Sequence, residues 1–515
     1  MITLESFLRG EWVAGRGAGA TLLDPTTGQP VATASTEGLD LGAAVRHARE
    51  VGGPALRALT FAERGAVLKA LSKAIHEHRD ALIDASILNA GTPRSDAKFD
   101  VDGASGTLAY YASLGKRLGD ARWIAEESEQ LTQSVRFHGR HVWVPLRGVA
   151  VHVNAFNFPA WGLAEKLAVA LLAGVPVISK PATATALTSY RMAKVMVETG
   201  ALPPGSFQLL SGSAGDLLDH LGPQDALAFT GSADTGLSLR GRHNVLASST
   251  RVNVEADSLN AAILCEDASD ETYGAFLRDV AQEVTQKSGQ KCTATRRVLV
   301  PAAQVDRVQA DLIDRIGRVV IGNPAHKDVR MGPLATAQQK ADYVAGVEKL
   351  VASGARIVWG HPTEVELVDA DARAGFFVGP VLLRADDPAS AAAVHEHEVF
   401  GPCTTLLPYQ TTEEAIALVA KGGGGLVASV YGDDRDQLGA LVLGLAPFHG
   451  RVLMGSKKVA DQAISPGLVL PSCVHGGPGR AGGGEELGGE RGLRFYMQRC
   501  AVQGDRALLD KMLVG

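Results

Sequence analysis

The sequence predicts an α/β protein with at least two domains, and three observations support this. The chain has 515 residues, which is too long for a single hydrophobic core. Hydrophobic residues make up 46% and charged residues 21%, values typical of globular proteins rather than of disordered or fibrous ones. From about Gly148 onward, short apolar runs alternate with helical stretches, the pattern of a parallel sheet with crossover helices.

The N-terminal part, residues 38 to 117, is predicted to be a mostly helical layer. Apolar residues recur every three or four positions between Ala62 and Ile83. The opening residues MITLESFLRGEWVAGRG do not resemble a signal peptide, and no run of about 18 apolar residues could span a bilayer. We therefore expect a cytoplasmic protein with no membrane partner.

Two α/β regions follow. In the first region, the predicted strands are GVAVHVN, VPVISKP, FQLLSG and DALAFTGS. The predicted helices are WGLAEKLAVALLAG, a segment through Met196 and a short stretch before DALAFTGS. The second region runs from about Leu259 to about Leu468, with strands predicted at RRVLVP, ARIVWG and FVGPVLL. These would form two separate lobes.

Two segments lie outside this alternation of strands and helices. Leu131 to Pro145 alternates polar and apolar residues like an antiparallel hairpin, and Arg494 to Gln503 is a further strand candidate. Such edge strands either pair between subunits or remain a solvated hairpin, and both interpretations stay open.

Charge and cysteine content narrow the class of protein. The formal net charge is −6 and there is no dense basic stripe, so we expect no nucleic-acid partner. The chain has an odd number of scattered cysteines and no CxxC pair, which argues against a disulfide framework and a zinc site. They are Cys265, Cys292, Cys403, Cys473 and Cys500.

Four residues are candidates for chemistry because each lies beside a predicted strand or turn. Cys292 in SGQKCTATRR follows a Ser-Gly-Gln turn, and Asn157 in VNAFNFPAW lies between a strand and a helix. Glu255 in VNVEADSLN and Glu398 in HEHEVFGP complete the set. Open α/β sheets bind ligands at the carboxyl ends of their strands. Alone, each residue is more often an inert thiol, a cap or a solvated charge.

Two glycine-containing segments are weak signals for a nucleotide. FTGSADTGLSL places Gly231 and Gly236 around a helix start, and LLSGSAGDLLDHL contains Gly212 and Gly215. Neither segment matches GxGxxG or GxxxxGK[ST], so phosphate binding is only weakly indicated.

Together, and in this order, the segments NFPAW, KPA, FTGS, the Glu255 loop, GQKC and EVFGP resemble the aldehyde dehydrogenase superfamily. The resemblance covers essentially the whole chain. It is closer still to the dehydrogenases that oxidise semialdehydes of ring-opened coenzyme A thioesters in aerobic degradation of aromatic acids. The closer segments include KPATATA, EADSLNAAIL and VHGGPGRAGGGEELGGERG.

The resemblance implies a catalytic mechanism. Cys292 would be the nucleophile that forms a thiohemiacetal, whose alkoxide is stabilised by Asn157 and the Cys292 backbone N–H. Glu255 would then activate the water that hydrolyses the enzyme thioester. Because the sequence after Glu255 departs from the usual family pattern, Asp257 is a rival for the base, or else a turn or cap residue.

It also implies a dinucleotide cofactor. Lys180 would bond the adenosine ribose, and Thr183 stands where many NAD-preferring members carry a glutamate that would repel a 2′-phosphate. We therefore predict NADP, although a protein that accepts both cofactors remains an alternative. The pyrophosphate and nicotinamide contacts implied by the resemblance are Gly231, Ser232, Phe156, Glu398 and Phe400. His395, Glu396 and His397 suit an ordinary surface segment, and we expect no metal.

The predicted substrate is a small aldehyde carried on a coenzyme A thioester. Members of the phenylacetate branch are usually fused to a further C-terminal domain, whereas this chain stops at Gly515, so we expect the stand-alone benzoate branch. His475 and Arg480 would border the substrate tunnel, in contact with coenzyme A or in loop packing. A coenzyme A-acylating dehydrogenase, a non-catalytic homologue and a transferase or binding module for another nucleotide are the alternatives, and Glu255 disfavours the first.

The resemblance implies an aldehyde dehydrogenase fold with a Rossmann-like cofactor domain, an α/β catalytic domain and a small β element for oligomerisation. We place the cofactor domain at residues 1 to 128 and 149 to 258, and the catalytic domain at 259 to 470. Residues 129 to 148 and 490 to 515 would form the oligomerisation strands, in a homodimer.

Overall fold

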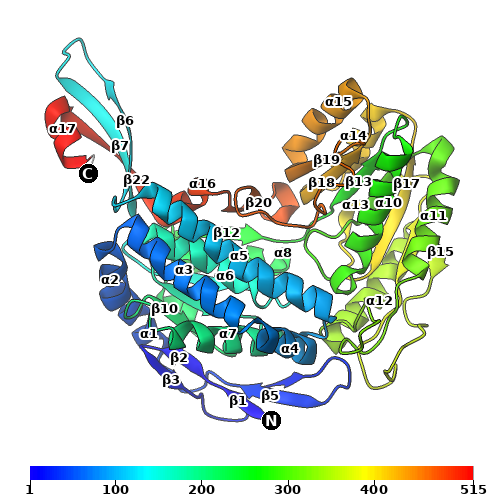
Figure 1. Ribbon diagram of the computed structural model, residues 1–515, viewed down its shortest axis with the longest axis horizontal. Helices are drawn as coiled ribbons and strands as arrows, with labels where there is room; N and C mark the ends of the chain where they lie inside the picture. The colour runs from blue at the N-terminus through cyan, green and yellow to red at the C-terminus, as the bar shows by residue number, and fades with distance from the viewer. Residues whose placement is uncertain (514–515) are drawn as a thin grey trace.

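The computed structural model describes residues 1–513 as two α/β lobes with a separate three-stranded sheet projecting from one of them (Figure 1). This is the predicted fold class. No described helix combines the length and the apolar character needed to span a membrane.

The first lobe contains a seven-stranded sheet in the order β12-β11-β8-β9-β10-β2-β3. The parallel strands are β8 (Ala150–Val153), β9 (Val177–Lys180), β10 (Phe207–Leu209), β11 (Ala226–Thr230) and β12 (Arg251–Glu255). The N-terminal strands β2 (Ser6–Leu8) and β3 (Glu11–Val13) extend it antiparallel at the β10 edge. Strands β8 to β11 match the four predicted ones, whereas β12, β2 and β3 were not among them.

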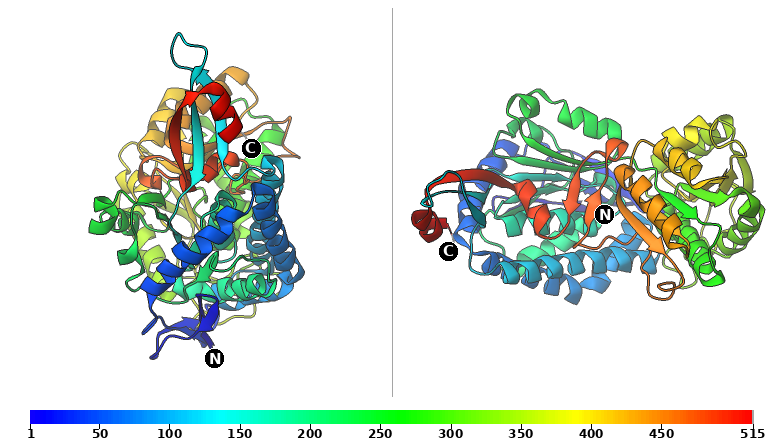
Figure 2. Two further views of the ribbon diagram at one scale, coloured as in Figure 1. Left: turned by 90° about the vertical axis from the view of Figure 1, so that its left-hand side faces the viewer. Right: turned by 90° about the horizontal axis from the view of Figure 1, so that it is seen from above.

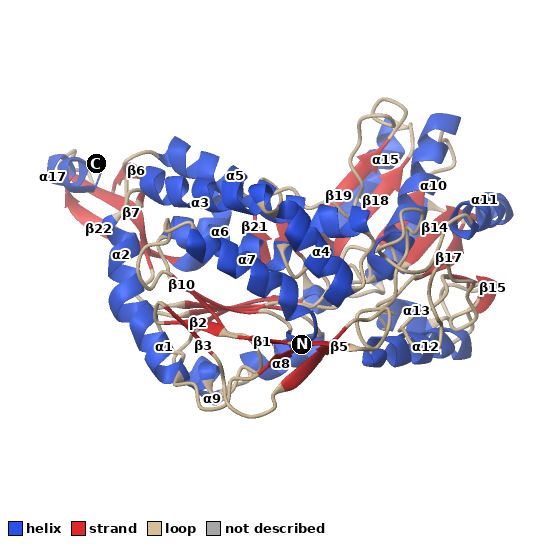
Figure 3. Ribbon diagram, turned by 60° about the horizontal axis from the view of Figure 1, so that its bottom comes forward, coloured by secondary structure: helices blue, strands red, loops and turns tan. Residues whose placement is uncertain are grey.

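Helices cover both faces of this sheet (Figure 3). The predicted helical layer is present as α1 (Leu41–His47), α2 (Gly53–Ala58), α3 (Phe61–Glu77), α4 (Arg79–Ala90) and α5 (Arg94–Leu118). The crossover helices are α6 (Trp161–Ala173), α7 (Ala186–Glu198), α8 (Ala233–Arg240) and α9 (His243–Ala247). Helix α6 is buried along its whole length between the sheet and α5. A small sheet of β1 (Ile2–Leu4), β5 (Pro30–Ala34) and β4 (Ala20–Leu23) packs beside this lobe.

The second lobe contains another seven-stranded sheet, ordered β15-β16-β17-β14-β13-β18-β19. Its strands are β13 (Ala261–Leu264), β14 (Arg297–Pro301), β15 (Arg356–Gly360), β16 (Val381–Arg384), β17 (Cys403–Tyr409), β18 (Gly425–Tyr431) and β19 (His449–Gly455). All are parallel except β15. Sequence analysis predicted β14, β15 and β16. It missed strands such as β13, because a short strand buried on both faces has no polar alternation to mark it.

The helices of the second lobe are α10 (Asp270–Thr285), α11 (Val305–Gly317), α12 (Ala337–Ala352), α13 (Ala392–Glu396), α14 (Thr412–Ala420) and α15 (Arg435–Leu445). Helix α10 precedes a short 3₁₀ turn, Gln286–Gly289, that leads to Cys292.

The projecting sheet has the order β22-β7-β6 and is wholly antiparallel (Figure 2). It contains β6 (Ile124–Gln130), β7 (Phe137–Pro145) and β22 (Met497–Asp505), with α17 (Arg506–Leu513) packed on it. The hairpin therefore begins before Leu131, and residues 131–136 form its turn. The prediction missed β6 because IAEESEQ is polar almost throughout and lacks an apolar alternation.

The C-terminal segment returns to the first lobe before it reaches β22. It forms a two-stranded ribbon of β20 (Val474–Gly476) and β21 (Glu485–Leu487), followed by the short helix α16 (Glu490–Leu493). Strand β21 packs on β12 and α6 of the first lobe, whereas β20 contacts β18 and β19 of the second lobe, so the ribbon bridges the two lobes beside the carboxyl end of the first sheet.

Candidate active site

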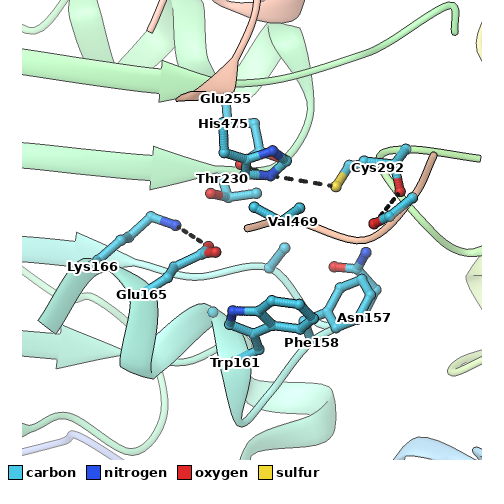
Figure 4. A pocket seen from close by; sticks show the side chains of 14 residues that line it. Asn157, Phe158, Trp161, Glu165, Lys166, Thr230, Glu255, Cys292, Val469 and His475 are labelled. Carbon is cyan, nitrogen blue, oxygen red and sulfur yellow. Dashed lines mark hydrogen bonds and ion pairs between the residues drawn. The ribbon is translucent and has the colours of Figure 1, made fainter. Parts of the chain in front are cut away.

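Two cavities meet at Cys292, between the lobes. The inner pocket is lined by Ala155, Asn157, Phe158, Trp161, Gly162, Glu165, Lys166, Thr230, Glu255, Cys292, Thr293, Gly467, Val469 and His475 (Figure 4). The outer groove runs from the start of α8 toward α12, and Asn157, Glu255 and Cys292 line it as well. The three predicted catalytic residues thus come together where the two cavities join.

Cys292 is held by its neighbours in a tightly turned segment. Lys287 and Ser288 adopt positive φ angles of 53° and 55°, which non-glycine residues rarely adopt. Asn260 Nδ2 donates hydrogen bonds to the Cys292 carbonyl oxygen at 2.7 Å and to that of Ala294 at 2.9 Å. The backbone on both sides of the thiol is therefore fixed, and Sγ faces the inner pocket (Figure 4).

Glu255 is the last residue of β12, and its neighbour in register is Thr230, the last residue of β11. Its side chain is buried, with 2% of its surface exposed. His475 of β20 lies between Glu255 and the thiol: Nε2 is 3.2 Å from Glu255 Oε2 and 3.9 Å from Cys292 Sγ (Figure 4). From the sequence we expected His475 to contact coenzyme A or to pack within a loop. It lies instead beside Cys292 and Glu255, the predicted nucleophile and base.

These three groups alter one another's protonation. Burial, reinforced by the carboxylate of Glu255, raises the pKa of the Cys292 thiol well above its usual value. Burial alone would also raise the pKa of Glu255, but the facing His475 and then Lys166 lower it below its usual range. Burial opposes the charged form of His475, yet Glu255 raises its pKa overall. The resting site thus favours a protonated thiol beside an ionised carboxylate.

Asn157 lies in the loop between β8 and α6. Its Nδ2 donates to the Gln290 carbonyl oxygen at 3.0 Å, which uses one of its two N–H groups. The start of α6 is held by Asp100 of α5, whose carboxylate accepts from the backbone N–H of Ala160 at 3.2 Å and of Trp161 at 2.8 Å. Through its bond to Gln290, the amide of Asn157 is linked to the segment that carries Cys292.

A charged cluster that sequence analysis did not predict forms one wall of the inner pocket. Lys166 Nζ lies 3.1 Å from Glu165 Oε1 and 3.0 Å from Glu486 Oε2, and all three side chains are buried. Burial opposes the charge of Lys166, but Glu486 and Glu165 raise its pKa overall. The available signal was local: Glu165 and Lys166 are adjacent charged residues in an otherwise apolar helix, where charge is costly unless paired.

The outer groove begins at the N-terminus of α8. Ser232, which was predicted to contact the pyrophosphate, is the helix N-cap, and its side chain accepts from the Thr235 backbone N–H. Asp257 Oδ1 accepts from the Ala233 backbone N–H at 3.0 Å and lies on the same groove, 3.9 Å from Arg480 through its other oxygen. These are the contacts of a capping residue rather than of a base beside Cys292.

The far end of the groove is formed by Glu398 and two aromatic rings. Glu398 accepts from the Ser258 backbone N–H at 3.1 Å and lies 3.6 Å from Arg296, and its burial raises its pKa to about 7. The rings of Phe156 and Phe400 meet edge to face with centroids 5.8 Å apart. A Cβ at Gly289 would lie 2.2 Å from the Gly401 carbonyl oxygen, so glycine lets this loop approach the Cys292 turn closely.

Lys180 and Thr183 lie beside the groove rather than in its lining. Lys180 ends β9, and Thr183 begins a 3₁₀ turn, with Ala182 between them on the groove wall. The Thr183 hydroxyl donates to the Gly212 carbonyl oxygen at 3.1 Å, which joins the KPATATA segment to the LLSGSAG segment. Burial lowers the pKa of Lys180.

The groove suits an extended anionic ligand such as a dinucleotide. The N-terminus of α8 lies at one end, and Lys180 lies beside the groove. The rings of Phe156 and Phe400 lie at the other end, near the Cys292 thiol. The prediction of an ordinary surface segment is wrong for His395, which is buried, with its ring 2.8 Å from the Pro388 carbonyl oxygen and 3.3 Å from Arg297.

The chain matches known proteins along nearly its whole length. The model of the aldehyde dehydrogenase family matches residues 12–502. The 3,4-dehydroadipyl-CoA semialdehyde dehydrogenase of Aromatoleum evansii is 46% identical over 479 residues, which cover 92% of this chain and 93% of that protein. An E. coli NADP dependent enzyme has a similar structure with a TM-score of 0.85, 25% identity and 98% of each chain covered.

A betaine aldehyde dehydrogenase of Staphylococcus aureus, solved in complex with NAD⁺, superimposes with a TM-score of 0.84 at 24% identity. That comparison covers 97% of this chain and 94% of the other, and it bears on the fold alone. With the family match and the relative from A. evansii, the conclusion is that this chain belongs to the aldehyde dehydrogenase family.

Proposed function

We propose that this aldehyde dehydrogenase oxidises the aldehyde group of a coenzyme A thioester semialdehyde to the carboxylic acid with NADP. The proposed substrate is 3,4-dehydroadipyl-CoA semialdehyde, in aerobic benzoate degradation. One observation carries this proposal: the identity of 46% to the A. evansii enzyme, spread over 92% of the chain. The mostly apolar inner pocket agrees with an aliphatic aldehyde arm, since Phe158, Trp161 and Val469 line it.

In the first half of the proposed reaction, Cys292 Sγ adds to the aldehyde carbon to give a thiohemiacetal. The thiol must lose its proton as the bond forms, and Glu255 and His475 are the groups close enough to receive it. The oxyanion would take a hydrogen bond from the second N–H of Asn157 and another from the Cys292 backbone N–H. Within the described part of the chain, that backbone N–H has no other acceptor.

A dinucleotide held in the outer groove would supply the acceptor for the hydride that leaves the carbon bonded to Cys292, and that carbon would then remain attached as an enzyme thioester. Gly231 and Ser232 would hold the pyrophosphate, and Glu398, Phe400 and Phe156 the nicotinamide end.

In the second half, Glu255 would remove a proton from the water that attacks the enzyme thioester and releases the acid. Its lowered pKa keeps the carboxylate ionised at neutral pH, as a general base requires. A coenzyme A-acylating enzyme would need no such base. The position of Glu255, buried beside Cys292 on the inner pocket, therefore favours hydrolysis.

The preference for NADP rests on the neighbourhood of Lys180 and Thr183. A 2′-phosphate carries close to two negative charges, so a lysine attracts it, and a threonine avoids the repulsion that a glutamate would cause. The Thr183 hydroxyl now donates to Gly212, and it would turn toward the phosphate to donate to it instead.

We further propose a cytoplasmic homodimer assembled through the sheet of β6, β7 and β22. Residues 1–128 and 149–258 would bind the dinucleotide, and residues 259–470 would complete the catalytic centre. The projecting sheet carries exposed apolar residues, including Val135 and Phe137, and α17 adds Leu508 and Met512. Light scattering after gel filtration tests the assembly: a monomer would contradict it.

The decisive experiment follows absorbance at 340 nm with NADP and with NAD. An aliphatic semialdehyde is supplied free and as its coenzyme A thioester, to wild type and to Cys292→Ala. We expect reduction that favours NADP, requires the thioester for full rate and disappears in the variant. Equal rates with the free aldehyde would remove support for the substrate, whereas activity in the variant would contradict the mechanism. A higher rate with the phenylacetate-pathway semialdehyde would assign the chain to that branch.

A further inference from the structure

A thiol, an imidazole and a carboxylate face one another at the junction of the two cavities. The ligating atoms of Cys292, His475 and Glu255 all lie within 4.8 Å of one another. Among the residues that the structure describes, neither oxygen of Glu255 receives a hydrogen bond of good geometry, although the side chain is buried. With His475 Nε2 as an ion-pair neighbour 3.2 Å from one oxygen, the buried carboxylate keeps room for a further polar or cationic ligand.

We propose that these three side chains bind a zinc ion, and that the bound ion reversibly inhibits the enzyme. Zinc prefers four ligands in a tetrahedron, at roughly 2.0 to 2.1 Å for imidazole and carboxylate and 2.3 Å for thiolate. That geometry separates sulfur from nitrogen by roughly 3.5 Å and nitrogen from oxygen by roughly 3.3 Å. The corresponding separations in the structure are 3.9 Å and 3.2 Å, and the sulfur and the carboxylate oxygen lie within 4.8 Å of each other, so side-chain rotations would bring all three atoms onto one ion.

The charges of the site fit a divalent cation. Binding breaks the Cys292 S–H bond, forms a Zn–S bond and releases the proton to solvent, and a protonated His475 likewise releases its proton. The site then holds one thiolate, one carboxylate and a neutral imidazole. The negative charges of the thiolate and the carboxylate balance the two positive charges of Zn²⁺. The fourth position, open toward the inner pocket, would hold water.

The ligand types select zinc over the commoner cellular cations. Mg²⁺ and Ca²⁺ prefer oxygen ligands, whereas thiolate and imidazole favour borderline ions such as Zn²⁺. A second cluster, of Glu165, Glu255 and Glu486, also brings three carboxylates together. There, Lys166 already lies 3.1 and 3.0 Å from two of the carboxylates and occupies the place of a cation.

Bound zinc would stop the reaction at its first step. It occupies the lone pair of Cys292 that attacks the aldehyde and the carboxylate of Glu255 that activates water. Inhibition should therefore compete with the aldehyde and be reversed by a chelator. Cation binding itself does not depend on the proposed substrate or on the preference for NADP, so the two proposals can fail separately.

Cobalt substitution gives a test that needs no enzymatic activity. Co²⁺ added to the full-length protein should produce d–d bands typical of tetrahedral coordination and a thiolate-to-cobalt charge-transfer band, both removed by excess Zn²⁺. Cys292→Ser should lose the charge-transfer band. The matched control Cys473→Ser, which removes an exposed thiol two residues before His475, should keep it.

His475→Asn should weaken Zn²⁺ binding by at least about tenfold, because loss of an outer-shell contact alone costs roughly 10- to 100-fold in metal affinity. His397→Asn, at the histidine beside the outer groove, should leave the affinity unchanged. Circular dichroism and thermal unfolding verify that each variant is folded. In wild type, Zn²⁺ should also protect Cys292 from iodoacetamide, whereas Mg²⁺ should not.

The proposal would be overturned by a cobalt band that survives Cys292→Ser, or by one that disappears in Cys473→Ser or His397→Asn. It would also be overturned if Zn²⁺ at micromolar concentration neither protected Cys292 nor changed the rate. Zinc binding without any dehydrogenase activity would support the metal site and contradict only the proposed function.

Discussion

The inner pocket and the outer groove meet at the same cysteine but are built in different ways. One side of the groove is formed by residues that directly follow strands or begin a helix, such as Gly231 and Ser232, and the other side includes residues of α12. The pocket is mostly apolar, but its buried charged side chains come from distant segments, among them Lys166 and His475. Ligand binding therefore rests on local geometry, whereas the chemistry rests on long-range contacts.

The sharpest test of the pocket is Glu255→Gln, which keeps the shape and removes the base. We expect hydrolysis of the enzyme thioester to slow by about 10²- to 10⁴-fold, the usual worth of a general base. Acylation should continue, so a rapid burst of reduced cofactor, close to one per active site, should precede the slow phase. Stopped-flow absorbance measures both phases, and a slow reaction without a burst would show that Glu255 acts before the thioester forms.

The matching test of the groove is Thr183→Glu. A carboxylate near the 2′-phosphate should lower kcat/KM with NADP, and it should preserve or improve the value with NAD. We expect the NADP to NAD ratio to fall by about 10- to 100-fold, equivalent to about 1.4 to 2.7 kcal/mol. Thr183→Gln serves as the uncharged control of similar size. An unchanged ratio would indicate that this residue does not face the cofactor.

The pH dependence of Cys292 alkylation tests the electrostatics of the pocket rather than those of the groove. Burial and Glu255 raise the pKa of the thiol, so its alkylation by iodoacetamide should still be accelerating as pH rises past 9. Glu255→Gln removes the adjacent negative charge, lowers that pKa and should speed alkylation at pH 8 by about tenfold, the effect of one pKa unit. Mass spectrometry of the Cys292 peptide measures the rate, with exposed Cys500 as internal reference. A rate already constant below pH 7 would contradict the expected protonated thiol.

The smallest expected effect concerns Asp257, the capping residue of α8. Asp257→Ala removes an acceptor for the Ala233 backbone N–H and should cost about 0.5 to 2 kcal/mol of unfolding free energy. Hydrolysis should persist, and any loss should appear in the KM for the cofactor. Urea unfolding and steady-state kinetics measure these effects. A collapse of kcat with a burst like that expected for Glu255→Gln would instead identify Asp257 as the base.

The sequence predicted the sheets and the groove better than the pocket, for a physical reason. Strand periodicity and helix-start glycines are local signals, so β8 to β11 and the start of α8 near Gly231 could be predicted from their own segments, whereas Ser232 came from the resemblance. Cys292, Glu255 and Asn157 came from a resemblance, and the structure places them around one cavity. His475 and Glu486 could not be located, because no local pattern shows that β21 packs on β12 and α6 while β20 packs on β18 and β19.

That placement of the C-terminal ribbon also affects when the catalytic centre can form. A ribosome makes α6, Glu255 and Cys292 well before it makes His475 and Glu486, so Lys166 first has only Glu165 as a partner. The second carboxylate and the imidazole arrive with the last segment, just ahead of the strand that pairs with β7. A chain that stops before residues 474–487 therefore carries an incomplete pocket. Only chains that include β20 and β21 can carry out the reaction.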